Sequence, residues 1–343
     1  MPVKYLPRPD LPEPILFALQ DPYYQEGLNE HFDQIDPKIR KKFEHHFSVT
    51  TVARPPRQRV LSKRYSDRVI LDPLGDGFWR MFGHTIHSIL QEAANRNPVL
   101  EAEVRLGTVV KVKVAGKAHQ VYIHGQADLY DPRIKMLDDY KITKAESMYY
   151  ENKDEYIFQL NALAYIWRQN GKPVDAIRNV YLFRNYDPRR YKEGGKYPKE
   201  HVAMIDIPIW DDARILKSIE DRVTKHMIAE LADDDHLPRC SSAERWESQT
   251  SYRAIKIDPK TGEPQKKSKF ASEVKMEVHD WIQANSTAAD KKGKVTNINY
   301  EVREIPGKSV RCDYCEIAAF CAQRQAELRA IMADQDEEEE IPE

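Results

Sequence analysis

Residues 121–142 read VYIHGQADLYDPRIKMLDDYKI, and this stretch predicts the β-hairpin on which the fold depends. The runs at 121–130 and 134–142 are rich in the residue types that strands prefer. The Asp-Pro-Arg segment at 131–133 is typical of a turn. We therefore expect the two runs to pair as antiparallel neighbours.

This hairpin would bring two carboxylates and a lysine together. A turn centred near residue 133 sets Asp128 opposite Asp139, with Cβ atoms about 5 Å apart. Two bare carboxylates at that distance repel, and a hard divalent cation that prefers oxygen ligands removes the repulsion. Lys141 lies two residues after Asp139 and projects from the same strand face. The group indicates metal-assisted hydrolysis of a phosphodiester, although such a pattern alone is more often a solvated pair of surface acids.

Composition limits the class of protein. The chain has 343 residues, which allows one large domain or two of ordinary size, and its charged fraction of 31% indicates a globular, soluble protein. Its net charge of -2 means that an anionic partner requires a local basic patch. No apolar run approaches the roughly 20 residues of a membrane helix, and the N-terminus lacks the apolar core of a signal peptide. We expect a cytoplasmic protein, in which structural disulfides are disfavoured.

The sequence divides into four predicted regions. Residues 1–47 are rich in proline and charge and predict an irregular arm with one or two short helices. Residues 48–235 carry the α/β core, residues 236–330 a small α/β unit, and residues 331–343 an acidic tail that we expect to be disordered. Outside the hairpin, hydrophobic periodicity predicts strands near 100–106, 180–183, 201–209, 252–257 and 295–302, and helices over 75–95, 146–170, 211–231 and 272–284.

Residues that flank the hairpin support a metal site. His87 and Gly83 lie four residues apart on a predicted helix, where an imidazole could reach a metal beside a position that permits close packing. Glu103, on a predicted strand, is equally well interpreted as an exposed acid or as a residue near the metal. Gln159 lies on the helix that follows the hairpin. Each of these residues alone is also what a surface helix or strand commonly carries.

The order of these elements resembles the RecB-type branch of the PD-(D/E)xK nuclease superfamily over residues 48–230. The shared order is GxxxH on a helix, Glu in a strand, GxxD, DxK on the returning strand and Gln on a helix. The resemblance implies a restriction-endonuclease-like core, in which helices flank a mixed central sheet, and a Mg²⁺- or Mn²⁺-dependent deoxyribonuclease. It implies metal ligation by His87, Asp128, Asp139 and the backbone carbonyl of Tyr140, and catalysis by Asp128, Asp139, Lys141, Gln159 and Glu103.

The same resemblance implies an exonuclease that acts on single-stranded or end-bearing DNA in phage or bacterial recombination or repair. An annealing protein or a helicase is the implied partner, and we find no nucleotide-binding motor in the chain itself. The chain departs from the family at Leu163, where the family helix often has a tyrosine; Tyr165 lies on a different helix face. The alternative is a non-catalytic DNA-binding or assembly protein that keeps a nuclease fold.

The cysteines form a second pattern, Cys312-x2-Cys315-x5-Cys321, with Cys240 as a candidate fourth ligand. Four thiolates suit a [4Fe–4S] cluster or Zn²⁺, and unrelated buried thiols are the other explanation. The triad resembles part of the iron–sulfur staple of the AddB nuclease domain and of CRISPR-associated RecB-like nucleases. In those families the fourth cysteine usually precedes the core, whereas Cys240 follows it. We favour the iron–sulfur cluster, with Zn²⁺ as the alternative.

Two basic stretches are candidates for contact with DNA. The first contains Arg57 and Arg64 and precedes the His87 helix. The second combines cations with tyrosines, and this combination suits single strands because cations follow phosphates while aromatic rings stack on bases. A solvated charged loop is an equally common explanation of the second stretch. Its candidate residues are Arg184, Arg189, Arg190, Tyr191 and Lys192.

Overall fold

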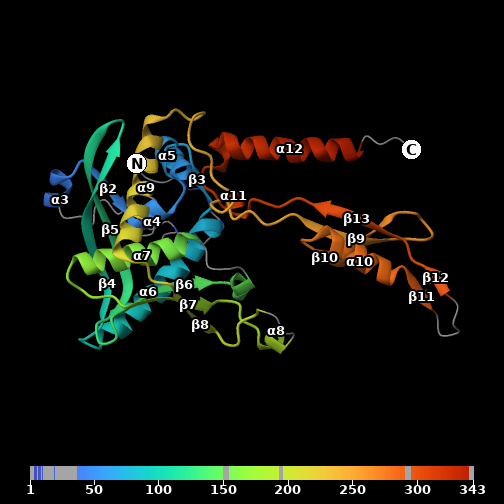
Figure 1. The fold of residues 1–343 in the computed structure, drawn as a ribbon, viewed down its shortest axis with the longest axis horizontal. Coiled ribbons are helices and arrows are strands. Elements are labelled where there is room, and N and C mark those ends of the chain that lie inside the picture. The colour runs from blue at the N-terminus through green and yellow to red at the C-terminus, as the bar shows by residue number, and fades with distance from the viewer. Residues whose placement is uncertain are drawn as a thin grey trace. The chain divides into compact units, whose positions relative to one another are not determined.

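A computed structural model gives the structure of the chain, and it describes residues 4–5, 7–8, 10, 19, 37–149, 154–192, 196–289 and 295–339. The chain divides into two compact units. The first comprises residues 1–240 together with 316–343, and the second comprises residues 241–315 (Figure 1). The predicted C-terminal unit was 236–330, so the compact unit of the structure is shorter at both ends.

A six-stranded mixed sheet forms the centre of the first unit. Its order is β2-β5-β6-β7-β8, and β4 pairs with β5. The β2–β5 and β6–β7 pairs are parallel, and the other pairs are antiparallel. The strands are β2 (His45–Ser48), β4 (Glu101–Val114), β5 (Lys117–Asp131), β6 (Met136–Thr143), β7 (Ala176–Phe183) and β8 (Val202–Ile207).

The predicted hairpin is the β5–β6 pair. Leu129 pairs with Asp138 and Asp131 with Met136, so the turn lies between residues 131 and 136. The same register continued by one residue sets Asp128 opposite Asp139, as the sequence predicts. Farther back along β5, residues 121–124 pair with β2 instead. Asp128 therefore lies in the short segment of β5 between its pairing with β2 and its pairing with β6.

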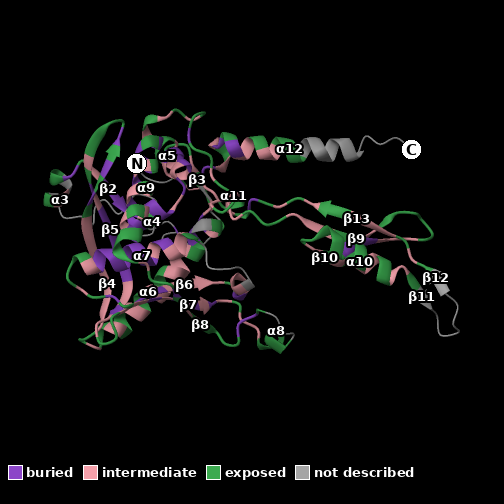
Figure 2. Cartoon of the chain, in the orientation of Figure 1, coloured by how far each residue is buried: buried purple, intermediate pink, exposed green. Residues whose placement is uncertain are grey.

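Helices pack against this sheet, and their order agrees with the periodicity of the sequence (Figure 1). α6 (Phe78–Asn95) contacts β4, β5 and β6, while α7 (Asp154–Gln169) contacts these strands and β7. α9 (Asp212–Leu231) packs on β4 and on α7, and it begins at Asp211, whose side chain accepts from the Arg214 amide. Figure 2 shows the buried residues of the first unit concentrated where α4, α7 and α9 meet the sheet.

Glycine at position 125 allows α7 to approach the sheet closely. A Cβ atom there would collide with Leu163 Cδ2 and would lie 3.2 Å from Val49 Cγ2. Leu163 is buried in the core with Phe158, Trp167 and Tyr130. Gly125, the first residue of the GxxD pattern, thus has a packing role, because it allows α7 to pack closely on the strand that contains Asp128.

The β-branched run at 48–52 forms a helix rather than a strand. α4 (Val49–Ala53) begins at Ser48, whose side-chain oxygen accepts from the Thr51 amide at 3.0 Å. Val49 and Val52 are buried against α7 and α9, so burial and the serine cap outweigh the strand preference of β-branched residues. The predicted irregular arm also supplies β2, which joins the central sheet.

The second unit is a small α/β structure. Its sheet has the order β10-β9-β13, all antiparallel, and α10 packs on it. Trp281 of α10 stacks on Phe270 with ring centroids 5.5 Å apart. The elements are β9 (Ser251–Ile257), β10 (Pro264–Ser272), α10 (Lys275–Asn285), β11 (Thr287–Ala289), β12 (Val295–Asn297), β13 (Tyr300–Ile305) and α11 (Val310–Asp313). Sequence patterns predict β9, α10 and part of β13 but not β10.

The predicted disordered tail is helical as far as the structure describes it. α12 runs over Ala322–Glu339 and includes residues 331–339 of the predicted tail, because alanine, glutamate, glutamine, arginine and leucine favour helices. None of the described helices combines the length and the apolar composition that crossing a membrane requires. The remaining elements are β1 (Lys4–Tyr5), α3 (Pro37–Lys42), α5 (Pro56–Arg64), β3 (Ile70–Leu71), η2 (Pro73–Gly77), η3 (Ala145–Tyr149), α8 (Pro188–Lys192) and η4 (Ala318–Phe320).

Candidate metal centre

Three side chains from three elements converge at the centre of the first unit. His87 Nδ1 of α6 lies 3.4 Å from Asp128 Oδ1 of β5 and 3.5 Å from Glu103 Oε1 of β4. One ligand atom from each of the three residues lies within 4.8 Å of the others. All three side chains are partly buried, so the group is shielded from bulk water without being sealed off.

Glu103 has an unusual backbone conformation at this point. Its φ is 55°, in the left-handed region that costs a residue with a side chain about 1–2 kcal/mol. The register pairs Ala102 with Leu129 and Val104 with Ala127, so Glu103 stands across from Asp128 at an irregular position of the ladder. Gln126 donates to the Glu103 carboxylate and holds it in place. Backbone strain of this kind is concentrated at functional sites.

A second contact group lies beside the first and is more deeply buried. Lys141 Nζ pairs with Asp139 Oδ2 at 2.5 Å, and Asp139 is 5% exposed. Gln159 Nε2 of α7 donates to Asp139 Oδ1 at 3.4 Å. Lys141 Nζ also lies 4.7 Å from the centre of the Tyr156 ring.

The backbone of β6 links the two groups. The Tyr140 amide donates to Asp128 Oδ2 at 2.6 Å, which fixes the Asp128 carboxylate next to the strand that carries Asp139 and Lys141. Asp128 thus contacts the His87 imidazole through one oxygen and the Tyr140 amide through the other. The sequence prediction assigned the carbonyl of Tyr140 to a metal, and the structure adds a separate role for its N–H.

Carboxylates control the protonation of His87. Burial by itself lowers the pKa of His87, but hydrogen bonds and charge from Asp128 and Glu103 outweigh burial and raise this pKa to about 10. The imidazole therefore carries a proton at neutral pH in this arrangement. A cation bound between the carboxylates would take over the charge-balancing role of that proton.

Burial and pairing act against each other at Asp139 and Lys141. Burial raises the pKa of Asp139 to about 6, although the Lys141 ammonium acts in the opposite direction. Burial lowers the pKa of Lys141, but the Asp139 carboxylate more than offsets it, and the pKa stands above its usual value. Lys141 is thus an ammonium group throughout the neutral range.

The donor set fits a hard divalent cation. Two carboxylates and one imidazole converge, and a third carboxylate, Asp139, sits behind Asp128 with its charge partly balanced by Lys141. Oxygen-rich sets with a single nitrogen suit Mg²⁺ and Mn²⁺. The three converging ligands include Glu103, for which the sequence allowed two interpretations. Asp139, a predicted metal ligand, is not one of the three, and it contacts Lys141 and Gln159 instead.

Sequence reasoning missed several residues that support the site. Arg105 Nη2 donates to Gln126 Oε1 at 2.7 Å, and Arg105 Nη1 lies 3.2 Å from His124 Nδ1. Gln126 in turn holds Glu103. Strand periodicity could have found this row, because Arg105 and Gln126 are each two residues from Glu103 and Asp128 on the same strand faces.

The residue of α7 that departs from the family pattern has a structural reason for doing so. Leu163, at the position where the family often has tyrosine, is 1% exposed and packs above Gly125. Tyr165 is 7% exposed. Neither side chain therefore offers a surface for a nucleic acid.

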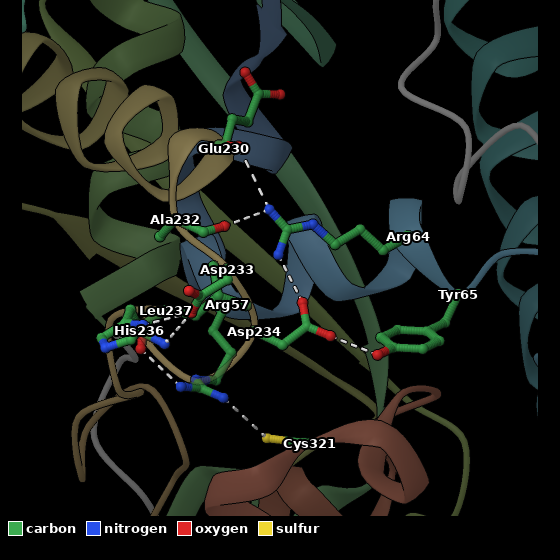
Figure 3. A network of polar contacts seen from close by, with 10 residues as sticks. All are labelled: Arg57, Arg64, Tyr65, Glu230, Ala232, Asp233, Asp234, His236, Leu237 and Cys321. Atoms are coloured by element: carbon green, nitrogen blue, oxygen red, sulfur yellow. Dashed lines mark hydrogen bonds and ion pairs between the residues drawn. The ribbon is translucent and has the colours of Figure 1, made fainter.

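The first basic stretch makes polar contacts with other parts of the first unit, as Figure 3 shows for Arg57 and Arg64. Arg57 is 3% exposed and donates to the carbonyl oxygens of Leu237 at 2.7 Å and Pro238 at 3.1 Å. Arg64 pairs with Asp234 at 2.6 Å and donates to the Ala232 carbonyl. These contacts tie α5 to the segment that follows α9. Arg57 therefore lies in the interior and Arg64 in a partly exposed ion pair, and contact of this stretch with DNA stays a prediction.

The second basic stretch is mostly exposed. Arg189, Tyr191 and Lys192 are exposed on α8. Arg190 instead pairs with Glu146 and stacks on the Tyr197 ring. Gly194 and Gly195 of the predicted loop lie outside the described residues. Arg184 follows β7, and its guanidinium carbon lies 3.5 Å from the centre of the Trp79 ring.

The four cysteines belong to both units. In the first unit, the Gln323 side chain holds both backbone groups of Cys240, with contacts of 2.8 and 2.9 Å, and Arg57 Nη1 lies 4.0 Å from Cys321 Sγ. In the second unit, the Cys315 amide donates to the Cys312 carbonyl at 3.4 Å, so these two residues share one helical turn. The cysteine-bound cofactor stays a prediction.

Comparisons with known proteins include distant structural likenesses. No protein-family model matches the chain, and no curated protein matches it. The crystal structure of SSO0001 is 17% identical, with a TM-score of 0.38 over 58% of this chain and 83% of that chain. A phage related exonuclease from Haemophilus somnus 129PT is 12% identical, with a TM-score of 0.26 over 44% of this chain and 72% of that chain. Both TM-scores are too low to establish a shared fold.

Proposed function

We propose that this protein is a metal-dependent deoxyribonuclease of the RecB-type PD-(D/E)xK class that acts on DNA ends. One observation carries the proposal: the ligand atoms of His87, Glu103 and Asp128 converge beside the buried ion pair of Asp139 and Lys141. Carboxylates, an imidazole and a lysine in one partly buried site match the needs of phosphodiester hydrolysis.

His87, Asp128 and Glu103 would hold Mg²⁺ or Mn²⁺, with Asp139 next to them. A divalent cation held there would lower the pKa of a bound water and would offset charge on the scissile phosphate. The Tyr140 amide keeps Asp128 oriented toward His87, because it occupies the other carboxylate oxygen. Gln126 does the same for Glu103.

Lys141 acts as a cation in this mechanism. Its pKa is raised by Asp139, so at neutral pH it donates hydrogen bonds and cannot accept the proton of an attacking water. An ammonium at this position stabilises negative charge that develops on a phosphate. Gln159 and Tyr156, both on α7, hold the lysine and its partner in place.

Asp139 is the group that tunes the site to pH. A carboxyl group with a pKa of about 6 is ionised above that pH and protonated below it. Because the protonated form neither pairs with Lys141 nor attracts a cation, we expect activity to fall as pH drops through about 6. In the same direction, metal affinity should rise with pH, since the His87 proton must leave when a metal binds.

We also propose a [4Fe–4S] cluster on Cys240, Cys312, Cys315 and Cys321, with Zn²⁺ as the alternative. Support for this proposal comes from the cysteine spacing alone. Protein purified without oxygen should be brown, with absorbance near about 400 nm and iron and sulfide in the expected ratio. A colourless protein that contains zinc would replace the cluster with Zn²⁺.

The decisive experiment compares cleavage by matched lysine variants. Lys141→Ala should abolish Mg²⁺- or Mn²⁺-dependent degradation of end-labelled DNA, as should Asp128→Ala. Lys135→Ala is the control. Lys135 lies in the turn of the same hairpin, pairs with Asp175, is about half exposed and is outside the site. Undiminished cleavage by both Lys141→Ala and Asp128→Ala in a clean preparation would contradict the mechanism.

The choice of DNA substrate tests action on ends. Linear single-stranded and double-stranded DNA should be degraded, while a closed circle of the same sequence should survive. Cleavage of the circle would leave a nuclease but remove the preference for ends.

A further inference from the structure

An aromatic cluster lies at the N-terminal end of α6. Phe78 and Trp79 are 40% and 47% exposed, and α6 has no buried residue along its whole length. The Trp79 ring centre lies 5.0 Å from that of Phe78 and 6.2 Å from that of Phe82, with both pairs edge-on. Exposed aromatic rings gathered in one place are typical of a binding surface.

A cation accompanies this cluster. The Arg184 guanidinium carbon lies 3.5 Å from the centre of the Trp79 ring, so the two groups stack. Arg184 follows β7, and its amide donates to the Thr143 carbonyl of β6 at 3.0 Å. The contact thus joins the beginning of α6 to the ends of two central strands.

Helix α6 and strand β7 both connect this cluster to the candidate metal centre. On α6, residues 79, 83 and 87 follow one another at four-residue spacing, which sets Trp79 about 12 Å along the helix from His87. A Cβ atom at Gly83 would meet nothing within 4 Å, so the helix surface between the two residues is open. On the sheet, Tyr181 is the register partner of Lys141, and Arg184 lies three residues farther along.

We propose that Trp79 and Arg184 form a stacking platform for an unpaired base of single-stranded DNA. The inference rests on the proposed nuclease function and names the form of substrate that this site takes. An indole can stack on any base, and a neighbouring guanidinium contributes attraction to the phosphates of the same strand. Bases inside a duplex already stack on each other, so the platform selects an unpaired strand or a frayed end.

The span between the platform and the metal centre suits such a strand. A separation of about 12 Å along α6 is within the reach of the ~4–16 nucleotides that single-strand-binding grooves commonly cover. The exposed cations Arg189 and Lys192 extend from the same strand end as Arg184. Positive groups therefore continue along the chain after Arg184, as an anionic strand requires.

Two other tyrosines of the second basic region, Tyr186 and Tyr197, are less suitable for stacking on a base. Tyr197 is 4% exposed, and Tyr186 stacks on it with ring centres 5.9 Å apart. Tyr186 also donates to the Lys199 carbonyl. These two rings pack together in a small core, whereas Trp79 is exposed and stacks directly on Arg184. Tyr191 is also exposed, on α8.

The test is equilibrium binding by the full chain in buffer without added divalent metal, so that a labelled strand is not cleaved. Trp79→Ala should weaken binding to a single strand about 10- to 100-fold and leave binding to a duplex of equal length unchanged. Trp79→Phe should retain most of the affinity because it keeps a ring. Arg184→Ala should also weaken single-strand binding. Its matched control is Arg214→Ala, which removes a guanidinium 4.1 Å from the Trp210 ring and should change nothing.

A spectroscopic readout locates the stacked base. An oligonucleotide with 2-aminopurine at successive positions should lose fluorescence at one position on binding to wild type and to Trp79→Phe, but not to Trp79→Ala. Thermal melts check the fold, and Trp79→Gln replaces Trp79→Ala if the latter melts early. Wild-type affinity and quenching in a folded Trp79 variant without a ring would overturn the platform.

The outcomes separate this inference from the proposed function. Trp79-dependent binding and quenching in a protein that never cleaves DNA with Mg²⁺ or Mn²⁺ would retain the platform and reject the nuclease. Metal-dependent cleavage together with unchanged binding by Trp79→Ala would retain the nuclease and reject the platform.

Discussion

Two arginine-rich stretches, residues 54–68 and 184–192, resemble each other in composition and have opposite environments in the fold. In the first, Arg57 is buried and its donors are used by carbonyl oxygens at 237 and 238. In the second, Arg189 and Lys192 extend into solvent from the short helix α8. Figure 2 shows the same contrast, with buried residues around α5 and exposed ones on α8.

The difference between the stretches is what lies next to each cation. The segment after α9 has carbonyl oxygens that no helix or strand uses, and the guanidinium of Arg57 satisfies two of them at once. No comparable acceptors are described around Arg189 and Lys192, so their charges stay hydrated and available to an anionic ligand. Arginine in the first stretch therefore serves stability, and arginine in the second is available for binding.

Arg57→Ala should have the largest effect in this comparison. It leaves the buried Leu237 carbonyl and the partly buried Pro238 carbonyl without this donor and opens a gap beside Cys321, so we expect a loss of about 3 kcal/mol of unfolding free energy. Denaturant unfolding followed by circular dichroism measures the change. Arg57→Lys is the control, and it should recover only part of the loss because one ammonium cannot reproduce the planar fork. Wild-type stability in Arg57→Ala would erase the distinction between the stretches.

Acid should destabilise the first stretch through His226. Burial, and then the charge of Arg59, lowers the pKa of His226 to about 3, and Arg59 Nε lies 3.2 Å from its Nδ1. Below about pH 6.5 His226 takes up a proton in the unfolded chain but not in the folded chain. The free energy of unfolding therefore falls as pH drops toward about 3. At pH 5 the loss should be about 2 kcal/mol.

The pH effect is measured by unfolding wild type and His226→Gln between pH 5 and pH 7. The variant cannot take up the proton, so its stability should change less over this range. Parallel curves for the two proteins would show that His226 does not carry the effect.

Removing the exposed cations should change binding and leave stability unchanged. Arg189→Ala combined with Lys192→Ala should weaken single-strand binding about tenfold and lower the slope of log affinity against log salt by about 1.4, the value for two phosphate contacts. The melting temperature should match wild type. A salt slope equal to that of wild type would mean that α8 does not contact the strand.

The smallest effect is expected at Lys63, in the first stretch but on its outer surface. Its Nζ lies 3.7 Å from Glu230, and the side chain is 74% exposed. Lys63→Ala should change unfolding free energy by less than about 0.5 kcal/mol. A large loss would mean that position in the stretch, rather than burial, decides which cations stabilise the fold.

Local patterns in the sequence were enough to predict the hairpin and the main helices. Period-two alternation and a short turn specify how β5 pairs with β6, and the register follows from the turn. These signals need no knowledge of distant residues. The same is true of α9, whose start at Asp211 is encoded by a capping side chain.

Features that depend on distant partners could not be predicted. The interior position of Arg57 depends on carbonyl groups 180 and 181 residues away in sequence. The helix at Val49–Ala53 forms because α7 and α9 cover it, against its strand-like composition. The segment His45–Ser48 forms a strand because it pairs with β5.

The candidate site shows the same division. The pairing of Lys141 with Asp139 follows from two-residue spacing on one strand. The approach of Glu103 to His87 does not, because it depends on a left-handed backbone at Glu103 and on the packing of α6 over β4. Sequence spacing alone therefore left Glu103 undecided.

The backbone of Glu103 also bears on how this protein would respond to selection. Its φ of 55° is a conformation that glycine adopts without penalty, so glycine there would relieve local strain and remove a carboxylate from a crowded acidic group. A screen that rewards heat resistance alone would favour that replacement, and it would remove a member of the His87 cluster. If the proposed metal site is used, keeping glutamate at residue 103 costs stability, and a stabilised variant with glycine there would lose a metal ligand.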